Sequence, residues 1–244
     1  MNRLIYSLSI MLILTSPVTA SAQIQGSITY EVKLNMHRNL PADRPEMKNM
    51  IPEFRLVQDI LVFNSTESLY KPVIEDEEEQ FENANGRRLR LARPENQTYV
   101  NQQTRKRILL QDFMGKKFLI EDSLNVTPWK IGSQTKQIGG YPCKQATFYN
   151  EQNKQSVVAW YTEKLRPYLG PDEFNTLPGA VLQVDVNNGE RLITAKTIDL
   201  RALKKNELVV PREGTKTTQA GFAKMIEEHM NRIRSAGGDV MIRN

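Results

Sequence analysis

Two alternating runs joined by Asn188-Gly189 are the feature that most constrains how this chain can fold. In the first run, Ala180–Val186, apolar residues take every second position, and the return run covers residues 190–200. Asn-Gly is the dipeptide preferred in tight hairpin turns, where both central residues need a positive φ. Leu177-Pro178-Gly179 precedes the first run, and proline fixes φ while glycine permits conformations that other residues resist. The sequence therefore predicts a β-hairpin that is entered through a rigid corner.

Alternation with a period of two recurs along the chain, which indicates that strands dominate the fold. The first strand is expected at residues 26–36, where Ile28, Tyr30 and Val32 share one face. Further strands are expected at residues 55–64, 66–73, 97–101, 106–112, 117–121, 129–131, 145–149 and 156–162. These segments follow one another too closely for the crossover helices that a parallel sheet requires. The sequence predicts a mainly β fold, with a single antiparallel curved sheet or partial barrel.

Near the end of the chain the apolar spacing changes to that of a helix. In residues 217–235, Phe222 and Ile226 are part of a series at three- and four-residue intervals, which is typical of an amphipathic helix. Thr218 or the threonine before it can cap the start of this helix. We expect the C-terminal helix to pack its apolar side on the sheet or to cover an open end of it.

The first residues have the features of a secretory signal peptide. Arg3 precedes an apolar run from Leu4 to Leu14, and Ala20-Ser21-Ala22 matches a small-residue cleavage site. The run is shorter than the roughly 20 apolar residues that a membrane anchor needs. We therefore expect cleavage after Ala22, so that residues 1–22 are removed. Residues 23–244 would then form a single β-rich domain, periplasmic or secreted, without a membrane span.

Composition narrows the classes of partner and the means of stabilisation. The formal net charge is +5 with both signs interspersed along the chain, which favours solubility and does not resemble the basic patch of a nucleic-acid-binding protein. Cys143 is the single cysteine, so the domain must be held together by its apolar core and not by disulfides.

Three short motifs occur in an order that resembles a known family. They are GGYPCKQA at residues 139–146, AWYT at residues 159–162, and the corner Leu177-Pro178-Gly179. Together they resemble the GLPGLI family, exported Bacteroidetes proteins without an assigned biochemical function. The motif that names the family aligns with Thr176, Leu177, Pro178, Gly179, Ala180 and Val181, and only its Leu-Pro-Gly part is identical. The resemblance implies export, an envelope location and one β-rich domain, and it supplies no catalytic residues and no cofactor.

Cys143 is the first candidate for chemistry. A reactive or metal-binding thiol needs a histidine or a cation close by. The two histidines, His37 and His229, are far from it in sequence, and no local spacing indicates a metal site. The alternative is that Cys143 is a small buried side chain in a strand.

Aromatic residues form a second candidate site. Tyr141, Trp160 and Tyr161 follow one another closely enough to line a groove for a sugar or an apolar ligand. Aromatic side chains in strands more commonly belong to the core, so both interpretations stay open.

Three further segments carry hypotheses of their own. Asp122-Ser123-Leu124 resembles a pattern for O-glycosylation, with Ser123 as the acceptor, or is a chance tripeptide in a turn. The glutamate-rich residues 75–79 suggest Ca²⁺ binding but lack the spacing of a dedicated calcium loop. Residues 166–176 precede the corner, and Asp-Glu-Phe at 172–174 need not be buried there.

Two function classes follow. The first is a non-enzymatic envelope protein that binds a partner protein or a hydrophobic ligand, because many strands are combined with no catalytic constellation. The alternative is a thiol- or metal-dependent protein or enzyme centred on Cys143.

Overall fold

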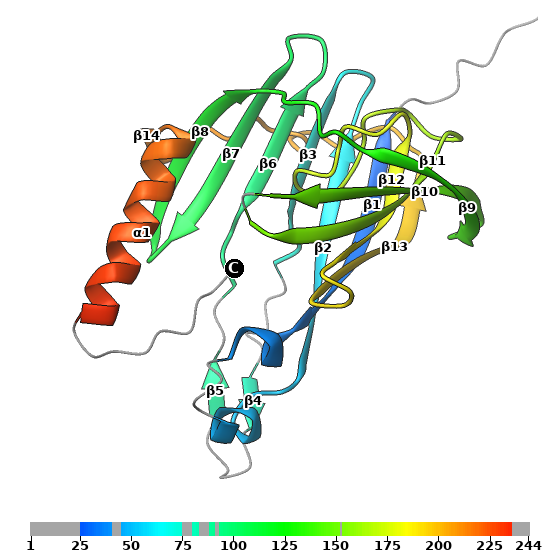
Figure 1. Ribbon diagram of the computed structural model, residues 1–244. Helices are drawn as coiled ribbons and strands as arrows, with labels where there is room; N and C mark the ends of the chain where they lie inside the picture. The colour runs from blue at the N-terminus through cyan, green and yellow to red at the C-terminus, as the bar shows by residue number, and fades with distance from the viewer. Residues whose placement is uncertain are drawn as a thin grey trace, which may run out of the picture.

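The computed structural model in Figure 1 describes residues 25–40, 45–74, 80–82, 88–90, 93–151 and 153–235 of the chain. Its main strands are β1 (Gly26–Asn35), β2 (Phe54–Phe63), β3 (Glu67–Pro72), β6 (Gln97–Asn101), β7 (Lys106–Phe113), β8 (Lys116–Ser123), β9 (Lys130–Ile138), β10 (Tyr141–Asn150), β11 (Gln155–Thr162), β12 (Ala180–Val186), β13 (Arg191–Asp199) and β14 (Thr215–Thr217). They form one twelve-stranded sheet, in the order β14-β8-β7-β6-β3-β2-β1-β13-β12-β11-β10-β9, which does not close into a barrel. Neighbouring strands are antiparallel, except that β14 pairs in parallel with β8. The mainly β fold with one curved sheet is confirmed.

The remaining elements are small apart from one helix. Two 3₁₀ helices, η1 (Met36–Asn39) and η2 (Pro45–Asn49), follow β1, and α1 (Gln219–Ser235) lies near the end of the chain. β4 (Gln80–Glu82) and β5 (Arg88–Arg90) form a separate two-stranded antiparallel sheet. The residues of the expected signal peptide, 1–22, and the glutamates at 75–79 lie outside the described residues.

The main core lies on one face of the central strands, where apolar side chains alternate. Tyr30 of β1 is opposite Ala195 of β13, and Val32 is opposite Ile193, so these fully or nearly fully buried side chains share a face. Figure 1 shows β10 and β11 crossing in front of β1 and β2, and residues from both groups of strands meet in this core. The bending of the sheet therefore lets it bury its own inner face.

The helix and the main core cover the same face of the sheet. Direct cross-strand partners run from Tyr70 through Thr98 and Leu109 to Ile120, which aligns these side chains on one face. Tyr70 belongs to the main core, and Ile120 belongs to the cluster under the helix. The opposite face of β3, β6, β7 and β8 is covered by a chain segment that includes Leu208 and Val210.

Helix α1 packs as its apolar periodicity predicts. Phe222 is buried against Phe118, with ring centroids 5.5 Å apart, and His229 contacts Phe113 edge-on at 5.4 Å. The Thr218 hydroxyl accepts a hydrogen bond from the Gly221 N–H at 3.0 Å, so Thr218 caps the helix. The expected C-terminal amphipathic helix on the sheet is confirmed.

The connection from β11 to β12, residues 163–179, packs into the main core instead of extending into solvent. Its leucines Leu165, Leu169 and Leu177 are buried, and so is Phe174. Gly179 is required by a close approach, because a Cβ at this position would lie 2.2 Å from the Thr162 carbonyl oxygen. The corner is thus a feature of packing, and it is not the result of an unusual φ at Gly179.

The hairpin predicted around Asn188-Gly189 is present, with a longer turn than expected. Val186 pairs with Arg191, so the turn contains four residues, and φ is positive at Asn187, Asn188 and Gly189. The Gly189 N–H donates to Asp185 Oδ1 at 2.6 Å, and the Glu190 N–H donates to the Val186 carbonyl at 3.1 Å. The positive φ at Asn188 and Gly189 is confirmed, but the two-residue turn is wrong.

The strand boundaries differ most where the sequence is polar. β9 continues to Ile138, well past the short segment expected at 129–131, and β14 was not expected. None of the helices in the described part of the chain is both long enough and apolar enough to cross a bilayer.

Gly179 gives a direct test of this fold. Gly179→Ala places a methyl group against the Thr162 carbonyl, and we expect it to lower the free energy of unfolding by about 2–4 kcal/mol. The control is Gly132→Ala, because a Cβ there meets first a flexible atom, Gln145 Oε1, at 3.0 Å. Denaturant unfolding of both variants makes the comparison, and equal stabilities would contradict the close-approach argument.

Candidate functional site

A pocket of about 760 Å³ opens on the inner face of the sheet. Its residues come from β1, β2, β3, β6, β11, β12, β13, the 3₁₀ helix η1, the β11–β12 connection and other segments between strands. They are Val32, Leu34, Asn35, Met36, Leu40, Ile51, Arg55, Val57, Asp59, Tyr70, Pro72, Arg93, Pro94, Asn96, Thr98, Asn153, Gln155, Asp172, Glu173, Phe174, Val186, Glu190 and Arg191. The volume lies within the range of roughly 300–1,000 Å³ that is usual for small-ligand sites.

The strand period explains why polar groups face this pocket. Arg55, Val57 and Asp59 are alternate residues of β2, so all three point to the inner face. Val57 pairs with Val32 across the strands, which gives the pocket an apolar floor. The pocket thus combines charged walls with an aliphatic base.

Asp59 is the centre of the first polar group. The carboxylate accepts a hydrogen bond from Tyr70 Oη at 2.5 Å and forms an ion pair with Arg93, whose Nη1 also donates to the Gln58 carbonyl at 2.7 Å. Burial raises the pKa of Asp59, and the opposing effects of Arg93 and the Tyr70 hydrogen bond are smaller. Burial, with the Asp59 charge next, also raises the pKa of Tyr70, so its hydroxyl remains a donor.

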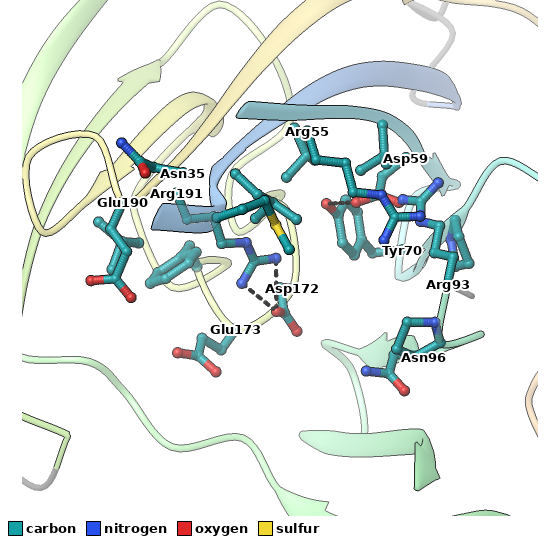
Figure 2. A pocket seen from close by; sticks show the side chains of 18 of the residues that line it. Asn35, Arg55, Asp59, Tyr70, Arg93, Asn96, Asp172, Glu173, Glu190 and Arg191 are labelled. Carbon is teal, nitrogen blue, oxygen red and sulfur yellow. Dashed lines mark hydrogen bonds and ion pairs between the residues drawn. The ribbon is translucent and has the colours of Figure 1, made fainter. Parts of the chain in front are cut away.

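Asp172 is the centre of the second group and belongs to the β11–β12 connection. Its Oδ2 accepts from both Nη atoms of Arg191 at 3.3 Å, and its Oδ1 accepts from Thr98 Oγ1 at 3.1 Å. Asp172 has a φ of +53°, a conformation that aspartate tolerates better than most residues. The buried Asn175 side chain donates to the Asp172 carbonyl at 2.7 Å and holds this turn. Figure 2 shows the two polar groups on different sides of the pocket.

Glu173 differs from the other acidic groups because it has no partner. Within the described residues, its carboxylate forms neither a hydrogen bond nor an ion pair. The residue as a whole is exposed, but it lines a concave, charged site, so protein atoms replace part of the water around its carboxylate. Desolvation, followed by the charge of Asp172, raises its pKa from 4.5 to about 7, against the opposing effects of Arg191 and Arg107.

Arg191 connects the two groups electrostatically. Desolvation lowers the pKa of its guanidinium, but Asp172, Tyr70, Asp59 and Glu173 together raise it above its ordinary value. The guanidinium therefore stays charged, and the pocket holds fixed donors beside fixed acceptors. Such a set can bind a ligand with several hydroxyl or amide groups.

The sequence-predicted thiol site is not formed at this pocket. Cys143 is buried, its Sγ lies 3.4 Å from the Tyr141 carbonyl oxygen, and burial raises the pKa of the thiol despite the opposing charge of Lys136. His37 binds the Ile51 carbonyl and His229 packs on Phe113. No group of three or more His, Cys, Asp or Glu side chains among the described residues is arranged to hold a metal ion.

The aromatic candidates do not line the pocket either. Tyr161 is buried in the main core, and Tyr141 and Trp160 are partly buried against that core. Lys136 Nζ lies 4.0 Å from the centroid of the Trp160 ring. Ser123 is exposed at the end of β8, so its O-glycosylation stays a prediction.

The residues aligned with the family motif, 176–181, pack where the chain enters β12. The segment before them contributes side chains to the pocket. Leu177, Ala180 and Val181 are buried, Pro178 is exposed, and Thr176 Oγ1 accepts from Trp129 Nε1 at 3.0 Å. Asp172 and Glu173 face the pocket, whereas Phe174, for which the sequence did not require burial, is buried. Sequence reasoning missed five residues of the site, Arg55, Asp59, Tyr70, Arg93 and Arg191. A signal was available in β2, where the charged Arg55 and Asp59 stand within a mostly apolar strand.

The burial of Cys143 predicts an unreactive thiol. Native protein should react with a thiol reagent at least about 100-fold more slowly than unfolded protein, because a raised pKa and burial both suppress the thiolate. A Ser133→Cys, Cys143→Ala variant is the matched control, since Ser133 is exposed on β9. Native modification of Cys143 at the rate of this control would contradict its burial.

The Asp59 group predicts a large effect on stability. Asp59→Ala removes the acceptor of the Tyr70 hydroxyl and the acid that pairs with Arg93, and we expect a loss of about 2–3 kcal/mol in the free energy of unfolding. Glu31→Ala removes an exposed ion pair with Lys196 on the other face of the sheet and should cost less than about 1 kcal/mol. Denaturant titration at neutral pH measures both, and similar losses would contradict the buried-pair argument.

Comparison with known proteins relates the fold to one family. Residues 70–220, more than half of the chain, match the family described as N-glycanase peptide, N-terminal domain, the N-terminal domain of PNGase F-II. No curated protein matches the chain. Two crystal forms of PNGF-II have a similar structure, each with a TM-score of 0.54 over 84% of this chain and with sequence identities of 17% and 18%.

The structural match covers most of this chain but only a small part of the PNGF-II chain. The aligned region covers 33% of the PNGF-II chain, so this protein spans about a third of the length of that relative. The expected GLPGLI membership is wrong. Of its three identical residues, Leu177 is buried and Gly179 lies close to Thr162, so these two meet a local packing requirement, whereas Pro178 is exposed. The chain belongs to the family of N-terminal domains of PNGase F-II, the N-glycanase peptide N-terminal domain family.

Proposed function

We propose that this domain binds a glycan in the pocket on the inner face of the sheet. The observation that carries the proposal is the pair of pre-arranged carboxylate–guanidinium groups, Asp59 with Arg93 and Asp172 with Arg191, facing one cavity. Sugar hydroxyls both donate and accept hydrogen bonds, and such groups offer an acceptor and a donor side by side. The aliphatic floor at Val32 and Val57 suits the C–H face of a sugar ring.

Family membership supports a glycan-related role for the domain. The family is described as the N-terminal domain of an N-glycanase, and the similar crystal structures are of PNGF-II. The observation that carries our proposal is a set of paired charges around a pocket, which supports binding, and we therefore propose binding of a glycan. We also propose that the protein acts outside the cytoplasm, which rests on the signal peptide predicted at residues 1–22.

A hydrophobic ligand fits the pocket less well. It would cover the carboxylates of Asp172 and Glu173 without offering them hydrogen-bond donors, and such desolvation is unfavourable. A polar ligand avoids this loss.

Calorimetric titration tests the proposal with the trimannosyl-chitobiose core of N-glycans and a biantennary glycan that ends in galactose. We expect saturable binding that Asp172→Asn weakens about tenfold or more, because the variant loses a charge-assisted hydrogen-bond acceptor worth about 1.5–3 kcal/mol. Asparagine also tolerates the positive φ of this position, so the fold is retained.

The matched control is Glu31→Gln, on the opposite face of the sheet, which should bind like the unmodified protein. Absence of binding to both glycans, or equal affinities of Asp172→Asn and the unmodified protein, would overturn the proposed role of this pocket.

A further inference from the structure

We infer that Glu173 makes the pocket selective for neutral glycans over glycans that carry a carboxylate, and that this selectivity disappears as the pH falls. The inference rests on the proposed function, because it concerns the ligand class and the regulation of the same pocket. It assigns to one side chain a role that the other acidic residues of the pocket do not have.

The arginines of the pocket are already engaged within the protein. Arg93 pairs with Asp59, and Arg191 pairs with Asp172. Arg55, the third lining arginine, also has a partner. Lysine and histidine are absent from the described lining residues. The positive charge of Arg93 and of Arg191 is therefore already balanced by an acid, and a ligand carboxylate gains less from either arginine than it would from an unpaired cation.

Glu173 adds a negative charge that nothing balances directly. Figure 2 shows it next to the Asp172–Arg191 pair. The charged groups that act on it are Asp172 in its own connection, Arg191 of β13 and Arg107 of β7. Each of the two arginines is bound to another acid, since Arg107 Nη2 lies 3.1 Å from Asp122 Oδ2. Glu190 also lines the pocket, but its Oε2 accepts from Asn187 Nδ2 at 2.6 Å.

The sign of the pH effect follows from the two forms of Glu173. Desolvation raises its pKa to about 7, so the carboxylate is mostly ionised above that pH and mostly protonated below it. The ionised form repels a ligand carboxylate and accepts hydrogen bonds from neutral hydroxyls. The protonated form has no charge and donates a hydrogen bond, which a ligand carboxylate can accept. Binding of acidic glycans should therefore tighten as the pH falls through 7, and binding of neutral glycans should change little.

The test compares ligands that differ only in charge. A biantennary glycan with terminal sialic acid is titrated as the free acid and as the sialic acid amide, with the galactose-terminated glycan as the neutral reference. At about pH 8 we expect the acid to bind about tenfold more weakly than the amide, in line with the effect of a like charge nearby. This difference should vanish at about pH 6, and Glu173→Gln should remove it at both pH values.

Two controls isolate Glu173. Glu163→Gln should keep the full difference, because Glu163 pairs with Lys144 on the surface and does not line the pocket. Glu173→Gln retains both histidines, so any pH dependence that they cause persists in that variant. The pH profile of the unmodified protein tests the inference even if Glu173→Gln does not fold.

Each outcome decides between the two proposals. Equal affinities of the acid and the amide at about pH 8, or an unchanged difference in Glu173→Gln, would overturn the selectivity while leaving glycan binding in place. Failure of the galactose-terminated glycan to bind at either pH would overturn the proposed function and this inference together.

Discussion

The packing of residues 163–179 against the inner face of the sheet is the constraint on which both the core and the pocket depend. Tyr30 is fully buried on that face, and its hydroxyl donates to the Val181 carbonyl at 2.7 Å, a contact between residues 151 positions apart. A buried hydroxyl without an acceptor is unfavourable, so this bond fixes where β12 begins. The same connection carries Asp172, and its buried leucines hold that carboxylate against Thr98 of β6.

The hairpin register gives the second constraint. Arg191 is the first residue of β13, opposite Val186 of β12 and Leu34 of β1. Since successive side chains of a strand point to opposite faces, a slip of one residue would turn the guanidinium away from Asp172. The four-residue turn thus sets the site as well as the fold. The turn at Asn188-Gly189 sets the register of β13, and this register places the Arg191 guanidinium in the pocket.

The sequence predicted those strands and the helix that have one buried face and one solvent-exposed face. Alternation identified the strand at β2, and three- to four-residue spacing identified α1 with its Thr218 cap. β9 was cut short because residues such as Ser133 and Thr135 are exposed and carry no apolar pattern. Alternation shows which residues share a face but not which face is inner, so Arg55 and Asp59 could not be assigned to a pocket. Asp172 was within reach, because an acidic pair before a rigid corner indicates a loop with a possible surface role.

The raised pKa of Glu173 has a consequence for the stability of the protein. Its pKa in the folded state, about 7, exceeds the ordinary value of 4.5, so the folded protein holds this proton more tightly than the unfolded chain. The stability contribution is therefore fully present below about pH 4.5 and is lost as the pH rises through 7. Glu207 has the opposite sign, because its hydrogen bonds to Arg201 lower its pKa to about 2, and its contribution is lost only as the pH falls toward that value. An acid that lowers stability at neutral pH is retained most easily where it serves binding, which agrees with its position in the pocket.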